Sequence, residues 1–193
     1  MLSLKDSLAV LKKTKALLEG HFVLSSGLHS PQYVQCAKLL SYPKKSEEFC
    51  KSLSTKIKKK FKKIDIILSP AMGGIVIGYI VGNLLNKETI FCERVNGKFT
   101  LRRGFSIKKN SKVLIVEDVI TTGKSSLECE KLVLANKGIT VGYACIIDRS
   151  NGKSSIKNKI VSQIKLDIPT YSEKDIPDDL SAIKAVKPGS RNL

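Results

Sequence analysis

VLIVEDVITTGKSS, at residues 113–126, places a short apolar run before two carboxylates and a loop of threonine, glycine and serine. The apolar run is typical of a buried strand, and the loop leads into a helix predicted from about residue 125 to 136. The stretch ends in the Gly-Lys-Ser of a nucleotide P-loop, but that motif needs a glycine where this chain has Asp118. A carboxylate there would repel a nucleotide's phosphates, so an ATPase is not expected.

The loop is better suited to a sugar phosphate. Glu117 and Asp118 offer acceptors for two neighbouring sugar hydroxyls. Residues 121–125 then supply backbone amides and hydroxyls for one phosphate, while Gly123 permits close approach and the helix N-terminus adds a positive dipole. The alternative explanation is that the two acids only end a strand and cap a turn.

The same order of strand, loop and helix recurs along the chain. Buried strands are predicted at residues 64–69 and 140–148, and a glycine-punctuated helix follows the first of them. This alternation predicts an α/β fold with a mainly parallel twisted sheet, Rossmann-like, flanked by helices. Ligands bind beyond the carboxyl ends of such strands, so the candidate loops are residues 69–74, 117–125 and 148–152.

The remaining segments complete this prediction. A helix is expected at residues 3–19, stopped by Gly20, and two short strands around a Ser-Gly turn follow from residue 22. Residues 88–105 are expected to form two β-segments around a turn at 95–97, and residues 160–168 an edge strand.

A lysine-rich stretch at residues 44–63 predicts an amphipathic surface helix. Its apolar residues recur every four positions, Ser46 is the expected cap, and Glu47 and Glu48 suit the first turn. The chain carries 34 basic and 17 acidic residues, a net charge of +17, which favours anionic partners. No aromatic side chains stand among these lysines as stacking platforms, so nucleic-acid binding is not expected from this helix.

Length and cysteine usage bound the class of protein. The 193 residues fit one domain, without an apolar run of the roughly 20 residues needed to cross a membrane. The N-terminus lacks the pattern of a secretory signal, and the five cysteines have no paired short spacing, so we expect a cytoplasmic protein with buried free thiols. His21 and His29 look isolated in the sequence, and neither is assigned a metal.

The stretch at residues 113–125 resembles the phosphoribosyl-diphosphate signature of the type I phosphoribosyltransferases. Three further segments narrow the resemblance to the orotate phosphoribosyltransferases: FVLSSGLHSPQYV from residue 22, SPAMGGI from 69, and FCERVNGKFTLRRGF from 91. IIDRSNG, from residue 146, is similar to that family's orotate-contacting Asp-Arg segment. The similarity runs from about residue 20 to 152.

The resemblance implies Mg²⁺-dependent transfer of phosphoribosyl from phosphoribosyl diphosphate to orotate, giving orotidine monophosphate and pyrophosphate in pyrimidine synthesis. It also implies one domain over residues 1–193, with a small hood of short strands at about 20–42 and the C-terminal segment. The family further implies a homodimer in which each mobile loop reaches the partner's site, and Mg²⁺ held mainly by the substrate, with Asp118 the candidate protein ligand.

Site residues follow from matched positions. The implied catalytic residues are Arg94, Lys98 and Asp118, with Arg94 and Lys98 stabilising the leaving pyrophosphate. Phosphoribosyl diphosphate is expected to contact these residues together with Gly73, Gly74, Glu117, Val119, Ile120, Thr121, Thr122, Gly123, Lys124 and Ser125. Orotate is expected to contact Thr121, Tyr33 and Arg149, because a guanidinium can form a two-pronged pair with its carboxylate.

Four positions depart from the pattern of many relatives, which have Lys at 25, 73 and 95 and His at 100 where this chain has Ser25, Gly73, Val95 and Thr100. The alternative functions are a purine phosphoribosyltransferase and a non-catalytic regulator that binds nucleic acid with the same fold. The loop arginine and lysine and Arg149 favour catalysis on orotate over both alternatives.

Overall fold

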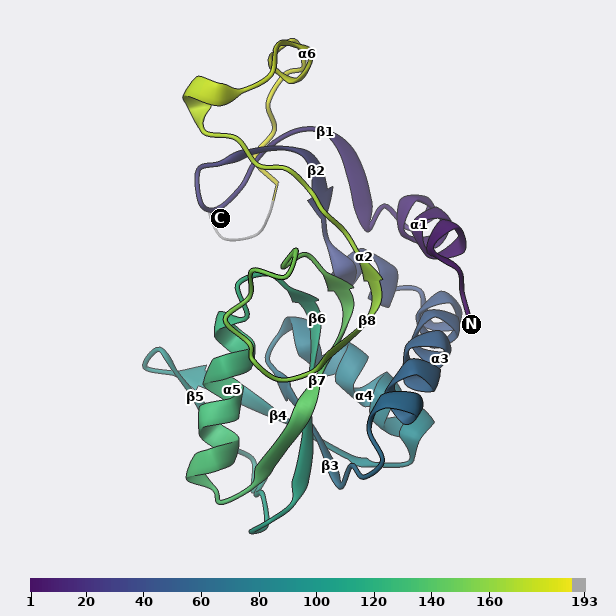
Figure 1. Ribbon diagram of the computed structural model, residues 1–193, viewed down its shortest axis with the longest axis vertical. Coiled ribbons are helices and arrows are strands. Elements are labelled where there is room, and N and C mark those ends of the chain that lie inside the picture. Colours follow the sequence, from purple (N-terminus) through teal and green to yellow (C-terminus); the bar gives the residue numbers. More distant parts are fainter. Residues whose placement is uncertain (189–193) are drawn as a thin grey trace.

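The structure, a computed structural model, describes residues 1–188 and is built on a six-stranded sheet (Figure 1). The sheet has the order β5-β4-β3-β6-β7-β8, in which every neighbouring pair is parallel except β4 and β5. Its strands are β3 (Ile66–Pro70), β4 (Glu88–Val95), β5 (Lys98–Leu101), β6 (Lys112–Ile120), β7 (Ile139–Asp148) and β8 (Ile160–Lys165). The mainly parallel α/β sheet and the edge position of β8 are confirmed.

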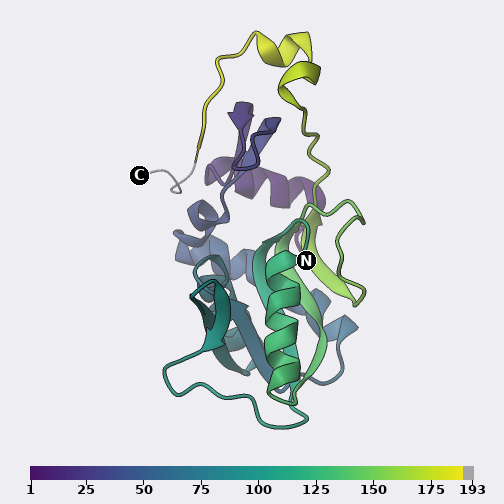
Figure 2. The same ribbon diagram turned by 90° about the vertical axis from the view of Figure 1, so that its left-hand side faces the viewer.

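Helices cover both faces of this sheet (Figures 1 and 2). α3 and α4 pack on one face and α5 on the other, whereas α1 lies against β1 and β8. The helices are α1 (Leu4–Lys13), α2 (Cys36–Leu40), α3 (Pro43–Lys60), α4 (Gly73–Leu85), α5 (Lys124–Ala135) and α6 (Asp178–Ser181), with a 3₁₀ turn at Glu173–Asp175. None of the helices within residues 1–188 is long and apolar enough to cross a membrane.

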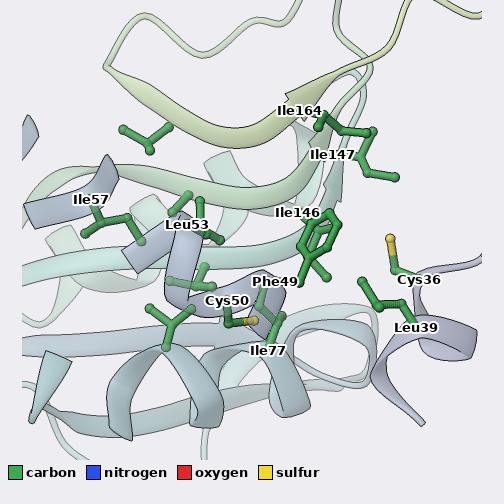
Figure 3. Packing of buried hydrophobic residues seen from close by; sticks show 14 of the residues in the cluster. Cys36, Leu39, Phe49, Cys50, Leu53, Ile57, Ile77, Ile146, Ile147 and Ile164 are labelled. Carbon is green, nitrogen blue, oxygen red and sulfur yellow. The ribbon is translucent and has the colours of Figure 1, made fainter. Parts of the chain in front are cut away.

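The larger apolar core lies between the sheet and the helices α3 and α4 (Figure 3). Phe49, Leu53 and Ile57 of α3 are fully buried there with Ile77 of α4 and Ile146 of β7. The predicted apolar face of the lysine-rich helix is therefore confirmed, since its period of four residues places these side chains on one side. A second cluster lies between the sheet and α5.

Two predicted helix boundaries are wrong. α1 ends at Lys13 instead of residue 19, because Lys15 has a φ of 58° and residues from Leu17 onward pair with β2. Ser46 is not the cap of α3: the helix starts at Pro43, which suits a first helical position because it has no N–H to satisfy. The Ser46 hydroxyl is instead buried and donates to the carbonyl oxygens of Leu39 and Tyr42.

A small hood stands over one end of the sheet. It contains the antiparallel hairpin β1 (Leu17–Val23) and β2 (His29–Val34), which confirms the two predicted short strands. The C-terminal segment arches over the hairpin (Figures 1 and 2) and returns to it at Val186, whose backbone bonds to His21 O and Val23 N at 2.9 Å each. Segments far apart in sequence thus share this layer.

The prediction that His21 and His29 are isolated is wrong. Their rings face one another across the hairpin, with His21 Nε2 2.6 Å from His29 Nδ1. The other ring nitrogen of His21 lies 2.9 Å from the carbonyl oxygen of Ile183, which has no proton to donate. The pair therefore ties both strands of the hairpin to the C-terminal segment, a contact that the spacing of the two residues did not indicate.

The five cysteines are free and buried, as expected of small apolar side chains. Residues 1–188 contain no group of three or more His, Cys, Asp or Glu side chains arranged to hold a metal ion. The last five positions of the domain predicted over residues 1–193 lie outside the described residues.

Candidate active site

Two of the three predicted ligand loops, residues 69–74 and 117–125, meet at the carboxyl ends of β3 and β6 together with the hairpin of β4 and β5. They surround an open cavity of about 380 Å³. Its lining consists of Pro70, Ala71, Met72, Gly73, Gly74, Arg94, Phe99, Glu117, Asp118, Val119, Thr121, Thr122, Gly123, Lys124 and Ser125. The third loop, 148–152, is not among the residues described in this lining. Of the residues expected to contact phosphoribosyl diphosphate, Lys98 and the buried Ile120 are not in this lining among the residues described.

Glu117 is a buried acid at the end of β6. Its side chain is 6% exposed, and its Oε2 accepts a 2.8 Å hydrogen bond from the Ser126 hydroxyl. Burial raises the pKa of Glu117 to about 7, because desolvation disfavours the charged form more than the single hydrogen bond favours it. Binding of a cationic centre or of hydroxyl donors in the cavity would restore the charged form.

Asp118 points toward the loop after β3. Its Oδ1 accepts a 2.9 Å hydrogen bond from its neighbour's amide, Val119 N, and burial raises its pKa. A Cβ built on Gly73 would lie 2.9 Å from Asp118 Oδ2, closer than real Cβ contacts. Glycine at position 73 therefore leaves room for this carboxylate beside the first turn of α4, and a side chain there would require Asp118 to move.

The loop after Asp118 runs directly into α5. Gly123 is the N-cap of the helix with a φ of 79°, and a Cβ at this position would lie 2.7 Å from the side chain of Ile156. Both facts require glycine. The first amides of a helix have no acceptor within it, and Lys124 and Ser125 at the start of α5 line the cavity, so this helix N-terminus offers donors for a phosphate.

The basic segment after β4 forms a tight hairpin. Asn96 and Gly97 have φ values of 50° and 77°, as a two-residue turn between antiparallel strands requires, which confirms the predicted turn. Arg94 lines the cavity and stacks on Phe99, with its guanidinium carbon 4.1 Å from the ring centre. Lys98 is exposed on β5, so the chain's own fold brings together Arg94 and the acids but leaves Lys98 apart.

A second, larger cavity of about 1160 Å³ lies between the sheet and the hood. Thr121 and Thr122 line both cavities and so mark where they meet. Tyr33 and Arg149, the residues expected to contact the base, line the second cavity. The Nε atom of Arg149 is buried and has no hydrogen-bond partner among the described residues, and burial lowers the pKa of this side chain.

The sequence did not identify every residue of the site. Ser126, which donates to Glu117, lies one position past the predicted phosphate loop, and only the packing of α5 on β6 brings them together. The hood cavity also includes residues from three separate segments: Leu24, Ser25, Ser26, Leu28, Gln35, Ile168, Thr170, Lys187 and Pro188. The segments 24–28 and 168–188 meet through the hairpin, which no local motif indicates.

Comparison with known proteins defines the family. The family described as phosphoribosyl transferase domain matches residues 42–173. An orotate phosphoribosyltransferase of Methylorubrum populi is 47% identical over 190 residues, which cover 98% of this chain and 97% of that protein. The chain belongs to the orotate phosphoribosyltransferase family.

Solved structures agree with this assignment to the orotate phosphoribosyltransferase family. The crystal structure of an orotate phosphoribosyltransferase from Aeropyrum pernix matches with a TM-score of 0.72 and 25% identity, covering 82% of this chain and 92% of that one. An adenine phosphoribosyltransferase from Thermoanaerobacter pseudethanolicus has a TM-score of 0.59 and 18% identity, with coverage of 70% and 88%. The latter likeness concerns the fold alone, so it gives no support to the purine alternative.

Proposed function

We propose that the two adjoining cavities bind phosphoribosyl diphosphate and orotate side by side. The reaction transfers phosphoribosyl to orotate and yields orotidine monophosphate and pyrophosphate, a step of pyrimidine synthesis. The observation that carries this assignment of the cavities is Arg149, which is half-buried and has a buried Nε without a partner among the described residues. A buried donor of this kind requires an acceptor, and the carboxylate of orotate supplies one.

The cavity beside Asp118 holds the sugar phosphate. The loop from Thr121 to Ser125 and the N-terminus of α5 bind the 5′-phosphate, and Glu117 and Asp118 accept hydrogen bonds from the ribose hydroxyls. The diphosphate lies toward Gly73 and Gly74 at the start of α4, whose amides also face this cavity. Thr121 and Thr122 then bring the anomeric carbon to the border with the second cavity, where orotate packs on Tyr33.

Charge complementarity accelerates the transfer. As the bond from the anomeric carbon to pyrophosphate breaks and the bond to the orotate nitrogen forms, positive charge develops on the ribose and negative charge on pyrophosphate. Glu117 and Asp118 line this cavity on the ribose side, and the β4–β5 hairpin, which carries Arg94 and Lys98, supplies the cations for the leaving group. Preorganised charges that match the transition state lower its free energy more than they stabilise the bound substrate.

The donor set fits a magnesium ion held jointly with substrate. Residues 1–188 have no cluster of three metal-ligating side chains, but Asp118 presents a carboxylate to the cavity beside Gly73. Mg²⁺ commonly binds through one or two carboxylates together with substrate phosphates. When bound, Mg²⁺ would neutralise charge on the diphosphate, and Asp118 is the residue that would hold it.

We propose that the enzyme is a cytoplasmic homodimer, with residues 1–193 acting as one domain. The dimer is supported by exposed apolar side chains on one side of α4: Met72 is 82% exposed, Val76 46% and Tyr79 70%. Exposed apolar residues at such spacing are typical of a protein interface. Lys98, which lies away from its own cavity, would act in the partner's site, as a loop exchange requires.

Mixing two impaired variants tests the loop exchange. Lys98→Ala and Asp118→Asn should each be nearly inactive, and mixed dimers should regain activity because one site then has an intact acid and an intact loop. Activity that stays low after subunit exchange is verified would show that Lys98 acts within its own chain or not at all.

A base-consumption assay with phosphoribosyl diphosphate and Mg²⁺ tests the function itself. Orotate should be consumed, whereas uracil, hypoxanthine and guanine should react far more slowly because they leave Arg149 unpaired. Preference for hypoxanthine or guanine would instead favour the purine alternative. Failure with all four bases would favour the non-catalytic regulator.

A further inference from the structure

The C-terminal segment that follows β8 is attached to the hood hairpin at two places. Tyr171 and His29 exchange backbone hydrogen bonds of 2.9 Å each, and the backbone of Val186 bonds to His21 O and Val23 N. Between these two places the segment leaves the hairpin and forms the 3₁₀ turn and α6 (Figures 1 and 2). A histidine of the hairpin is therefore a partner at each attachment.

The rings of these two histidines form a chain of hydrogen bonds that also ends on the segment. The carbonyl oxygen of Ile183 can only accept, so His21 Nδ1, which lies 2.9 Å from it, carries a proton. In a neutral ring the Nε2 atom of His21 is then an acceptor, and it lies 2.6 Å from His29 Nδ1, which donates to it. His21 is only 5% exposed, so loss of either bond would leave one of its ring nitrogens without a partner and away from water.

The same residues adjoin the larger cavity, which is proposed above to bind orotate. Most of residues 24–28 line this cavity, and they form the turn between the strands that carry His21 and His29. Residues 187–188 line it as well, and they follow directly on Val186. The ring pair therefore connects two parts of the lining that come from opposite ends of the chain.

We infer that His21 and His29 are positioning residues that hold the C-terminal segment against the orotate site. This inference rests on the proposed function, since it takes the larger cavity as the site of the base. When the segment detaches, orotate loses the part of its site that residues 187–188 provide, and its apparent affinity falls with the fraction of chains in the attached state. The cavity beside Asp118 has no residue of the hood hairpin or of the C-terminal segment in its described lining, so binding of phosphoribosyl diphosphate should not depend on the ring pair.

The main test is His29→Leu in the full chain, with kcat and KM measured for both substrates. The KM for orotate should rise roughly 2- to 10-fold, the factor that corresponds to the net contribution of one hydrogen bond. The kcat and the KM for phosphoribosyl diphosphate should stay nearly unchanged. His29→Asn should recover part of the affinity, because its side-chain amide offers an N–H close to the position of Nδ1.

A double-mutant cycle shows whether the two rings act as one unit. His21→Leu removes both the bond to Ile183 and the bond to His29. Adding His29→Leu to this variant should not raise the KM for orotate further, because His29 has already lost its partner. Additive increases would mean that the two histidines act independently.

Backbone hydrogen exchange measures the attachment of the segment without any substrate. The amides of Val23 and Val186 donate across the contact between the hairpin and the segment. Their exchange in His29→Leu should become roughly 2- to 10-fold faster, because it requires the segment to detach. Exchange at Tyr143, whose amide donates to Lys159 O within the main sheet region, should not change.

Ser172→Ala is the matched control. The Ser172 hydroxyl donates to Asp175, and both residues are exposed in the C-terminal segment, so this substitution removes a side-chain hydrogen bond of the segment that does not reach the hairpin. The KM for orotate and exchange at Val186 should match the wild type. Unfolding temperatures verify that each variant is folded. If His29→Leu does not fold, His29→Gln replaces it, since its amide lies nearer the position of Nε2 and leaves His21 without its donor.

Several outcomes would overturn the role of the ring pair. They are an unchanged KM for orotate in His29→Leu, an equal rise in the KM of both substrates, or a His29→Asn variant as impaired as His29→Leu. Faster exchange at Val186 with an unchanged KM for orotate would show that the pair holds the segment but that the segment does not position the base. A wild-type enzyme inactive on orotate would refute the proposed function, and the exchange measurement would still show whether the pair holds the segment.

Discussion

The proposed site has two cavities, which are assembled in different ways. The phosphate cavity is the one beside Asp118, and the base cavity is the larger one between the sheet and the hood. The phosphate cavity is formed by loops that each follow a strand of the sheet, so every group in it belongs to a short contiguous segment. The base cavity combines the hairpin turn, Arg149 after β7, and residues 168–188 of the C-terminal segment. In the proposed function, chemistry on the sugar phosphate therefore depends on loops of the sheet, whereas the choice of base depends on contacts between distant segments.

This difference implies that the two activities can be impaired separately. Substitutions at the strand ends should lower turnover with every base, because they alter the common substrate. Substitutions in the base cavity should change the ranking of bases while binding of phosphoribosyl diphosphate remains. Thr121 and Thr122 line both cavities, so substitutions at these two residues should affect both turnover and the ranking of bases.

Asp118→Asn should have the largest effect and act on the phosphate cavity alone. The substitution removes a negative charge that lies beside the reacting sugar and that is the proposed protein ligand of magnesium. It should lower kcat on the order of 10²- to 10³-fold, as for other groups that stabilise developing charge. Steady-state kinetics with orotate measure the loss. Asp65→Asn is the control, since Asp65 accepts from Lys112 N at the opposite end of the sheet. Equal losses in both variants would indicate damage to the fold.

Arg149→Ala should impair the selection of the base and leave the binding of phosphoribosyl diphosphate unchanged. Orotate would lose its charge partner, and truncating one side of such a pair costs roughly 2 to 5 kcal/mol, so its preference over uracil should fall about 30-fold or more. Both bases are measured in one preparation, together with the affinity for phosphoribosyl diphosphate. Retained preference, or loss of the diphosphate substrate as well, would show that Arg149 is not the carboxylate partner.

Glu117→Gln should change how the stability of the protein depends on pH. The pKa of Glu117 is raised from an ordinary 4.5 to about 7 in the folded chain, so the contribution of its protonated form to stability is fully present below pH 4.5 and is lost as pH rises through 7. Gln cannot ionise, so the ligand-free variant should gain stability over wild type on the order of 2 to 3 kcal/mol by pH 8. Its turnover should nevertheless fall.

Denaturant unfolding of wild type and Glu117→Gln at pH 5 and pH 8 measures this effect. Titrations of other groups cancel in the difference between the two proteins. A difference in unfolding free energy that does not change with pH would show that Glu117 is not a buried, readily neutralised acid.

Lys187→Ala should give the smallest effect. Lys187 lines the base cavity, which also contains Arg149, and a second cation in the same cavity favours an anionic base. The KM for orotate should rise by about threefold, comparable to an exposed charge contact of under 1 kcal/mol, and the KM for phosphoribosyl diphosphate should stay constant. Lys184→Ala, an exposed lysine of the same segment, serves as the control. A change in both variants would indicate a general charge effect.

Much of the fold and the phosphate cavity could be predicted because their signals are local. The apolar run before Glu117, the Asn96–Gly97 turn and the period of Phe49, Leu53 and Ile57 each specify structure within a few residues. The location of the ligand-binding loops then follows, because the carboxyl ends of parallel strands lie at the same edge of the sheet and ligands bind there. These signals do not depend on which distant segment packs nearby.

The errors arise where tertiary contacts override local pattern. Leu17 and Leu18 continue a helical pattern, but pairing with Val34 and Tyr33 places them in a strand. His21 and His29 meet only because the register of the hairpin brings their rings together. The C-terminal segment then reaches His21 through the carbonyl oxygen of Ile183. Ser126 was missed for the same reason, since its partner Glu117 lies on another element.

Two hydrogen bonds join Val186 to β1, so residues near the end of the chain complete the site during synthesis. The described lining of the phosphate cavity ends at Ser125, whereas the base cavity includes Lys187 and Pro188. A ribosome must therefore add about 60 more residues after the phosphate loop, roughly 3 to 12 seconds of elongation at about 5–20 residues per second, before orotate has its full binding site. The base cavity is therefore completed only by the last part of the chain to be made.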